Sequence, residues 1–141
     1  MKNKILGLLF IYFLSNSVNA NVIHIVKADD ELKWINMPSS AGKYVVIAGD
    51  PKQKGLFVVR VKFPPNYSIA PHHHNHYEYD TVISGSCNIA KGNVVTKENG
   101  LLATAGTFVS IPPHIVHYGW TGPEGAIIQL SGTGPWKPLY E

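Results

Sequence analysis

The 141-residue sequence contains a single cysteine, Cys87, and few charged residues, and both shortages restrict what the protein can be. One cysteine cannot close a disulfide within the chain, so stability has to come from a packed core or from a bound metal. Hydrophobic residues make up 45% of the chain and charged residues 15%, which argues against a disordered protein. No amphipathic stretch is long enough to predict a helix. These shortages disfavour a disulfide scaffold, a coiled coil and a helical repeat.

The first 20 residues have the three-part layout of a secretory signal peptide. Lys2 and Lys4 precede an apolar run from Ile5 to Leu14, and small or polar residues then lead to Ala20. The apolar run is about half of the roughly 20 residues that span a hydrocarbon core, so a permanent anchor is the weaker alternative. We expect cleavage after Ala20, a periplasmic or secreted protein without a stable membrane anchor, and a single domain over residues 21–141.

The positive charge of the chain does not point to a nucleic-acid partner. The formal net charge is +3, and removal of Lys2 and Lys4 would take away two of these charges. The remaining lysines are spread singly and form no basic stripe. We therefore predict no nucleic-acid binding.

Thirteen glycines and ten prolines divide the rest of the chain into short β-rich runs. We predict an all-β sandwich or barrel with strands at Val22–Val26, Leu32–Ile35, Tyr44–Ala48, Leu56–Phe63, Tyr77–Ile83, Cys87–Ala90, Val94–Lys97, Leu101–Thr104, Thr107–Ile111, Ile115–Trp120 and Ala126–Leu130. Cys87 is expected to be a small buried strand residue. Pro135 and Pro138 cannot continue a central strand, so the C-terminus is expected to be a surface tail packed through Trp136, without a chemical role.

Six of the seven histidines fall into two short segments, 72–76 and 114–117. In an extended backbone, His72 and His74 point to the same face. Glu78 adds a carboxylate after a turn, and His117 arrives from a later strand. Three neutral imidazoles and one carboxylate suit one divalent transition metal, and Fe, Mn, Ni, Zn and Cu all bind such ligands. The sequence therefore predicts a metal site made of His72, His74, Glu78 and His117.

Two alternatives compete with this ligand set. A second register uses His74, His76 and Asp80, and a histidine-rich loop that binds no metal is the other. The apolar strands predicted on both sides of the first segment favour the metal site. His73 and His76 then either orient the ligands or face solvent, and His114 is expected in an exposed loop.

The pattern from His72 through His74 and Glu78 to Gly85 resembles the first cupin motif, H-x-H-x3-E-x6-G. The second cupin motif, G-x5-P-x-G-x2-H-x3-N, is matched at three positions by Gly106, Pro112 and His117. The resemblance extends over about the whole chain after the signal segment. It implies a cupin double-stranded β-helix, a jelly-roll barrel with the four ligands inside.

The sequence departs from the cupin motifs at three positions. Asn66 replaces the leading glycine of the first motif, a tolerable change because asparagine accepts left-handed backbone. In the second motif, His114 replaces a glycine and Thr121 replaces the final asparagine. None of these positions is an expected metal ligand.

Four protein ligands leave two positions of an octahedral ion for water, dioxygen or a substrate. We expect an oxidoreductase of the dioxygenase type acting on a small organic molecule. A metal-dependent isomerase or lyase and a non-catalytic metal or small-ligand binding protein of the cell envelope are the alternatives, because the cupin fold hosts many functions. The roles of Gln129 and Ser131 stay open, and Val22–Val26 is a candidate strand for pairing in a homodimer.

Overall fold

The computed structural model describes residues 23, 25–26, 32–38 and 40–140. This part of the chain forms nine strands: β1 (Ile35–Asn36), β2 (Lys43–Ala48), β3 (Gly55–Phe63), β4 (Ser68–His73), β5 (Glu78–Lys91), β6 (Leu101–Thr104), β7 (Phe108–Ile111), β8 (His117–Gly134) and β9 (Leu139–Tyr140). No stretch of the described residues forms a helix long and apolar enough to cross a membrane.

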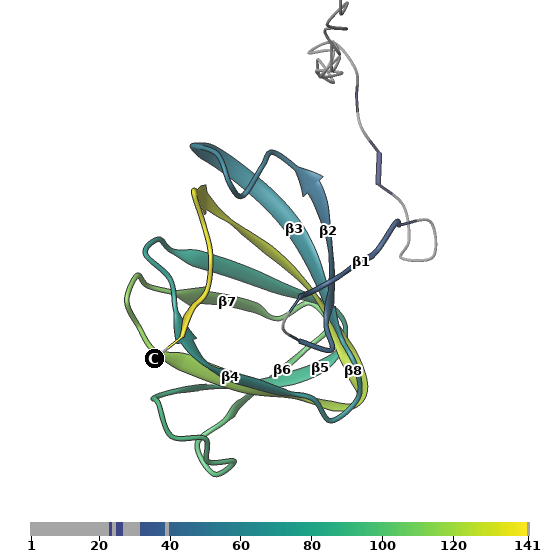
Figure 1. Cartoon of the computed structure of the whole chain (residues 1–141). Coiled ribbons are helices and arrows are strands. Elements are labelled where there is room, and N and C mark those ends of the chain that lie inside the picture. The colour runs from purple at the N-terminus through teal and green to yellow at the C-terminus, as the bar shows by residue number, and fades with distance from the viewer. Residues whose placement is uncertain (1–22, 24, 27–31, 39, 141) are drawn as a thin grey trace, which may run out of the picture.

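All strand pairs are antiparallel, and the sheet curls into a barrel (Figure 1). One path through the sheet runs β1-β2-β3-β8-β4-β9, and β5 pairs with β6, β7 and β8. The long strands β5 and β8 pair along most of their length, from Glu78 opposite Gly132 to Lys91 opposite His117. The predicted all-β jelly-roll architecture is thereby confirmed.

Two pairs of predicted strands are each one continuous strand. Tyr77–Ile83 and Cys87–Ala90 lie largely within β5, and Ile115–Trp120 and Ala126–Leu130 lie largely within β8. The predicted break around Gly85 is absorbed by shifts of register in the β5–β8 pairing. Gly85 has φ +70, and a Cβ there would lie 2.1 Å from the carbonyl oxygen of Gly125. Glycine thus lets the strand bend without ending.

The prediction of a strand at Val94–Lys97 is wrong. The backbone N–H of Thr96 donates to the Tyr118 hydroxyl at 3.0 Å, and the same hydroxyl donates to the Thr96 carbonyl oxygen at 2.8 Å. A side chain therefore satisfies backbone groups that a ladder would otherwise use. At the N-terminal run, Ile23, Ile25 and Val26 belong to no strand, and the rest of Val22–Val26 lies outside the described residues. The expected signal peptide also lies outside them.

Strand β4 was missing from the predicted strands, although the metal-site argument assumed extended backbone at His72–His74. The strand carries few β-branched or aromatic residues, because its sequence is Ser-Ile-Ala-Pro-His-His. It pairs with β8 on one side and β9 on the other, with His72 directly opposite both His117 and Tyr140. The tertiary pairing, rather than local propensity, makes this segment a strand.

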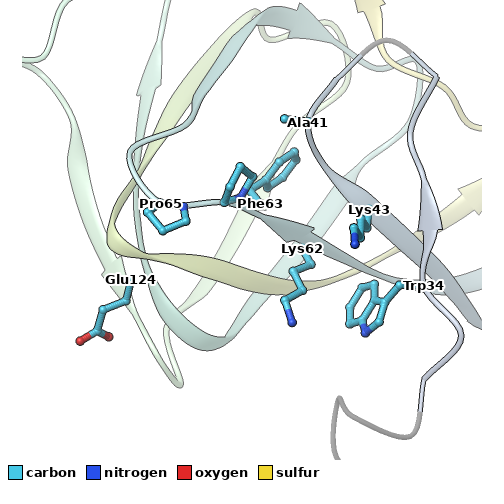
Figure 2. Close-up of a pocket in the computed structure, with 8 residues that line it drawn as sticks. Trp34, Ala41, Lys43, Lys62, Phe63, Pro65 and Glu124 are labelled. Carbon is cyan, nitrogen blue, oxygen red and sulfur yellow. The ribbon is translucent and has the colours of Figure 1, made fainter.

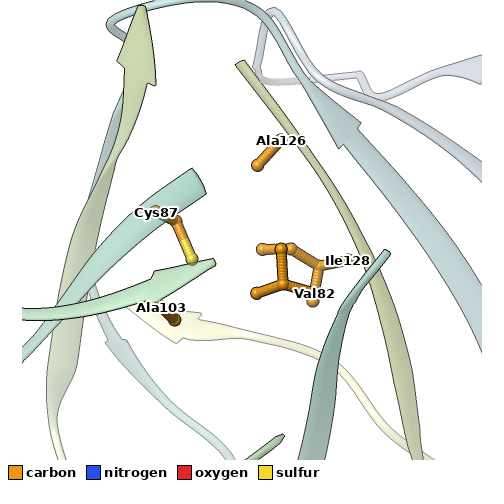
Figure 3. Close-up of a cluster of buried hydrophobic side chains, with 5 residues drawn as sticks. All are labelled: Val82, Cys87, Ala103, Ala126 and Ile128. Atoms are coloured by element: carbon orange, nitrogen blue, oxygen red, sulfur yellow. The ribbon is translucent and has the colours of Figure 1, made fainter. Parts of the chain in front are cut away.

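The main apolar core lies between β5, β6 and β8 (Figure 3). It consists of small and branched side chains that are each at most 6% exposed: Val82, Cys87, Ala103, Ala126 and Ile128. Cys87 is 1% exposed, as predicted, and burial raises the pKa of its thiol to about 11. The thiol therefore behaves as a packing group. A second cluster, Phe57, Val59 and Leu130, packs against Trp136.

Candidate metal centre

The barrel brings the four predicted ligands into one cluster. His72, His74, Glu78 and His117 each offer a nitrogen or oxygen atom, and these atoms all lie within 4.8 Å of one another. His72 comes from β4, Glu78 starts β5, and His117 starts β8. His74 follows directly after β4. His72 is partly buried, and the other three side chains are buried, with Glu78 5% exposed.

Each histidine of the cluster uses Nδ1 to bond a backbone carbonyl oxygen. The partners are Ala70 for His72 at 2.7 Å, Lys137 for His74 at 2.9 Å and Ile115 for His117 at 2.9 Å. A carbonyl oxygen only accepts, so Nδ1 carries the proton and Nε2 of the neutral ring keeps its lone pair. Metal-bound histidines commonly show this arrangement, in which one ring nitrogen is fixed by hydrogen bonding.

Burial keeps the three imidazoles in the form that binds a metal. It lowers the pKa of His72 to about 4, opposed by the hydrogen bond to Ala70. Burial also lowers the pKa of His74 and of His117, with their backbone hydrogen bonds opposing the shift. The rings are therefore neutral at pH 7.

Glu78 turns an oxygen toward two of these imidazoles. Its Oε2 lies 2.7 Å from Nε2 of His74 and 3.8 Å from Nε2 of His117. Neither His74 Nε2 nor Glu78 Oε2 has a hydrogen-bond partner among the described residues. A neutral imidazole with its proton on Nδ1 and an ionised carboxylate face each other as two acceptors, and a cation between them would satisfy both. The donor set and these unpartnered atoms fit a divalent transition metal.

The C-terminal tail packs through Trp136, as predicted, and it also reaches the cluster. The ring of Trp136 stacks on His74 with 4.2 Å between the ring centroids and an angle of 17°. The next residue, Lys137, accepts the His74 hydrogen bond. Strand β9 then pairs with β4 at His72 and His73. The sequence signal was a tryptophan between two prolines, but nothing local indicates where an extended tail will pack.

Asp80 is a further buried polar residue at this end of the barrel. It is 6% exposed, and burial together with the neighbouring charge of Glu78 raises the pKa of its carboxyl group well above the usual value. The sequence had named Asp80 only in the second ligand register, with His74 and His76. The structure does not include His76 in the cluster, whereas His72 and His117 lie in it together with His74. The strand alternation that places Asp80 two residues after Glu78 was the signal that could have identified it.

Two further histidines, His73 and His114, lie beside the cluster. His73 is partly buried, and its ring centroid lies 6.0 Å from that of exposed His114. The backbone N–H of His114 donates to the His74 carbonyl oxygen at 2.8 Å, and its φ is +62. Asn66 has φ +54, as expected for a residue replacing a glycine. The exposed position predicted for His114 is confirmed.

Two positions on β8, Gln129 and Tyr118, have different surroundings. Gln129 accepts a hydrogen bond from Arg60 Nε at 3.2 Å, on the face opposite to Ile128 and Leu130. Gln129 therefore does not line the interior. Tyr118 is the neighbour of His117 on β8; it is only 2% exposed, and its hydroxyl donates to the Thr96 carbonyl oxygen.

Thr121, which replaces the motif asparagine, holds the turn before β4. Its hydroxyl donates to the Pro64 carbonyl oxygen at 2.7 Å and accepts the Tyr67 N–H at 2.8 Å. Thr121 is 2% exposed, and its backbone N–H donates to the Tyr67 carbonyl oxygen at 2.9 Å. The threonine at this motif position therefore makes polar contacts that hold the segment between β3 and β4.

A pocket of about 220 Å³ is lined by none of the cluster residues (Figure 2). Lys43 and Lys62 line it from directly opposite positions on β2 and β3. The Lys62 ammonium lies 5.6 Å from the centroid of the Trp34 ring, a cation–π contact. Figure 2 shows Glu124 at the other end of the pocket from Trp34. The cation–π contact between Lys62 and Trp34 helps to hold the segment before β1 against the sheet.

No family model and no curated protein matches the chain. Solved structures do match in fold. The polyketide cyclase RemF from Streptomyces resistomycificus gives a TM-score of 0.65 at 15% identity, covering 84% of this chain and 87% of its own. A protein with a double-stranded β-helix domain from Klebsiella pneumoniae gives 0.63 at 22% identity, covering 85% and 100%.

An RmlC-like cupin from Shewanella frigidimarina gives a TM-score of 0.60 at 18% identity, covering 79% of this chain and 91% of its own. These identities are too low to transfer an activity, but the matches cover most of every chain compared. The antiparallel barrel, the order of its strands and these likenesses agree with the resemblance seen in the two sequence motifs. The chain has the cupin fold, a double-stranded β-helix.

Proposed function

We propose that the protein binds one divalent transition metal through His72, His74, Glu78 and His117 and acts through it on a small organic molecule. The observation that carries this proposal is the shared orientation of the three histidines. Each has its Nδ1 proton fixed by a backbone carbonyl, which leaves Nε2 available to a metal. Four protein ligands leave room for substrate on a five- or six-coordinate ion.

A bound metal would supply Lewis-acid activation or, as Fe(II), dioxygen chemistry. The chain itself contributes neutral imidazoles, a carboxylate and an apolar barrel that limits access of water. Trp136 covers one face of His74 and restricts how that ring can move. These residues prepare a site for a ligand that approaches from the side not covered by the tail.

The experiment is elemental analysis of tag-free protein, alone and as two variants. We expect about one metal ion per chain in the wild type and its loss in His72→Ala. His114→Gly is the matched control, because His114 is exposed and its positive φ suits glycine. A folded wild-type protein that binds none of Fe, Mn, Ni, Zn or Cu would refute the proposal.

For the reaction, we propose an oxidoreductase of the dioxygenase type. Oxygen consumption with a panel of small enolisable or phenolic compounds tests it, and consumption has to depend on the metal. The similarity in fold to a polyketide cyclase favours a second candidate, a metal-dependent isomerase or lyase that converts substrate without oxygen. Product formed under anaerobic conditions would favour that candidate. A ligand recovered chemically unchanged would instead support a non-catalytic binding protein.

We also propose export to the periplasm or beyond, on the basis of the signal-like layout of residues 1–20. Mass spectrometry of the protein from its native host should find a chain that starts at Asn21. Pairing of Val22–Val26 between two subunits stays a prediction, and light scattering that shows a monomer would refute it.

A further inference from the structure

The C-terminal tail, residues 135–140, follows β8 and contacts two of the four clustered ligands. The backbone N–H of Trp136 donates to the Pro51 carbonyl oxygen at 2.7 Å, which ties the start of the tail to the segment between β2 and β3. At its far end, β9 pairs with β4 at His72. Between these two anchors, the tail contacts His74. The tail is therefore fixed on both sides of its contact with that ligand.

Two groups of the tail hold the His74 ring from different directions. The Trp136 ring stacks on it with the centroids 4.2 Å apart, and the Lys137 carbonyl oxygen accepts its Nδ1 hydrogen at 2.9 Å. The other ring nitrogen, Nε2, lies 2.7 Å from Glu78 Oε2 and has no hydrogen-bond partner among the described residues. The tail therefore occupies a ring face and Nδ1, and it leaves Nε2 for a metal.

The fold alone does not explain a tryptophan at this place in the tail. The Trp136 ring also packs against the second apolar cluster, with its centroid 5.6 Å from that of Phe57. Its Nε1 is buried and has no hydrogen-bond partner among the described residues, and an unpaired buried donor costs free energy. Leucine or phenylalanine would pack against the same cluster without this cost. The property that distinguishes tryptophan here is the electron-rich indole face that it turns to His74.

Both tail contacts become stronger when His74 binds a metal. Coordination through Nε2 places part of the charge of the ion on the imidazole, and positive charge is attracted to the face of an aromatic ring, most strongly to that of tryptophan. The same charge makes the Nδ1 hydrogen a better donor to the Lys137 carbonyl oxygen. An interaction that is stronger in the bound state raises the affinity for the metal, and by reciprocity the metal stabilises the docked tail.

We propose that the C-terminal tail is part of the metal site, with Trp136 as a positioning residue that favours the metal-bound form of His74. Metal binding and docking of the tail then stabilise each other. The inference rests on the metal site proposed above. Trp136 is not one of the four clustered ligands, and both sequence motifs that resemble those of cupins end before it.

The test compares the binding of Mn(II) and Zn(II) by calorimetry on tag-free, metal-stripped protein. Trp136→Leu removes the aromatic face and keeps an apolar side chain, and Trp136→Phe keeps a weaker aromatic face. Trp34→Leu is the matched control, because it removes a cation–π contact with Lys62, outside the metal cluster. Val59→Ala is the control for stability, because it weakens the same apolar cluster and leaves both tail contacts with His74 in place.

We expect Trp136→Leu to bind each metal about 3- to 30-fold more weakly than the wild type, with Trp136→Phe between the two. Trp34→Leu and Val59→Ala should stay within about twofold of the wild type, although Val59→Ala lowers the melting temperature. In the wild type, metal should slow the hydrogen exchange of backbone amides in residues 135–140, and it should slow them less in Trp136→Leu. A ring that only packs against the apolar cluster would change the melting temperature and neither metal readout.

Four results would overturn the inference: wild-type affinity in Trp136→Leu, a loss in Trp136→Phe as large as in Trp136→Leu, an equal loss in Val59→Ala, or exchange in the tail that does not respond to metal. If Trp136→Leu does not fold, wild-type affinity in Trp136→Phe overturns it. Failure of the proposed function is a different result. A wild-type protein that binds neither metal refutes the metal site itself, whereas a binding wild type with an unaffected Trp136→Leu refutes only the role of the tail.

Discussion

The inner face of β5 has two environments, and the contrast between them separates function from stability. At its start, Glu78 and Asp80 are buried with polar oxygen atoms that lack partners among the described residues. Further along, Val82 and Cys87 are buried among apolar side chains of β6 and β8. The apolar part supplies the free energy that holds the barrel together. Burial of the polar part costs some of that free energy, because it keeps unpartnered ligand atoms available for a metal.

The largest effect is expected at the polar end, from Glu78→Ala. Loss of this ligand should weaken metal binding at least about 100-fold, more than the loss of a partner that only orients a ligand. The metal-free protein should not become less stable, because the variant removes a buried acid. Metal analysis and thermal unfolding in the presence of a chelator measure the two effects. Metal retained at full stoichiometry would contradict the assignment of Glu78.

At the apolar end, Ile128→Ala should have the opposite profile. We expect the free energy of unfolding to fall by about 2–5 kcal/mol, because Ile128 is only 6% exposed and the core cannot fill the space fully. Metal affinity of the folded protein should stay within about threefold of the wild type. Denaturant unfolding and calorimetry provide the measurements. The control is Leu56→Ala, which is 82% exposed and should change stability by less than about 0.5 kcal/mol.

On β8, Thr121→Val tests a polar contact that stabilises the fold. The variant leaves the Pro64 carbonyl oxygen and the Tyr67 N–H without their partner. We expect a loss of about 1–3 kcal/mol in the free energy of unfolding. Thr121→Ser retains the hydroxyl and should lose less. Equal stability of Thr121→Val and the wild type would show that water replaces the hydroxyl.

A further effect is the dependence of metal affinity on pH, which is small close to pH 7. Burial raises the pKa of Glu78 in the metal-free protein to about 7, and the hydrogen bond with Asp80 partly opposes the shift. A proton on this carboxyl competes with the metal, so affinity should fall roughly tenfold for each pH unit below 7 and level off above it. The His72 ring, with a pKa of about 4, adds to the slope only at lower pH. A flat profile between pH 5 and 7 would contradict a ligand role for Glu78.

Much of the candidate site could be predicted because its residues are close in sequence. Strand alternation relates His72 to His74, and a fixed spacing relates both to Glu78. His117 was predicted as a ligand from a later strand and from its match to the second motif, but local patterns cannot pair strands so far apart. Strand β4 was missed for the same reason, because only its pairing with β8 and β9 makes it a strand.

The sequence by itself determined an all-β chain with clustered histidines, a buried cysteine and asparagine at a left-handed turn, because residue type and short-range spacing govern these features. Only the tertiary structure decided that Lys137 and Trp136 contact His74 and that Tyr118 replaces a strand partner for Thr96. These contacts join segments far apart along the chain or depend on atomic orientation. Their free energy arises only after the barrel closes, so no local pattern of residues encodes them.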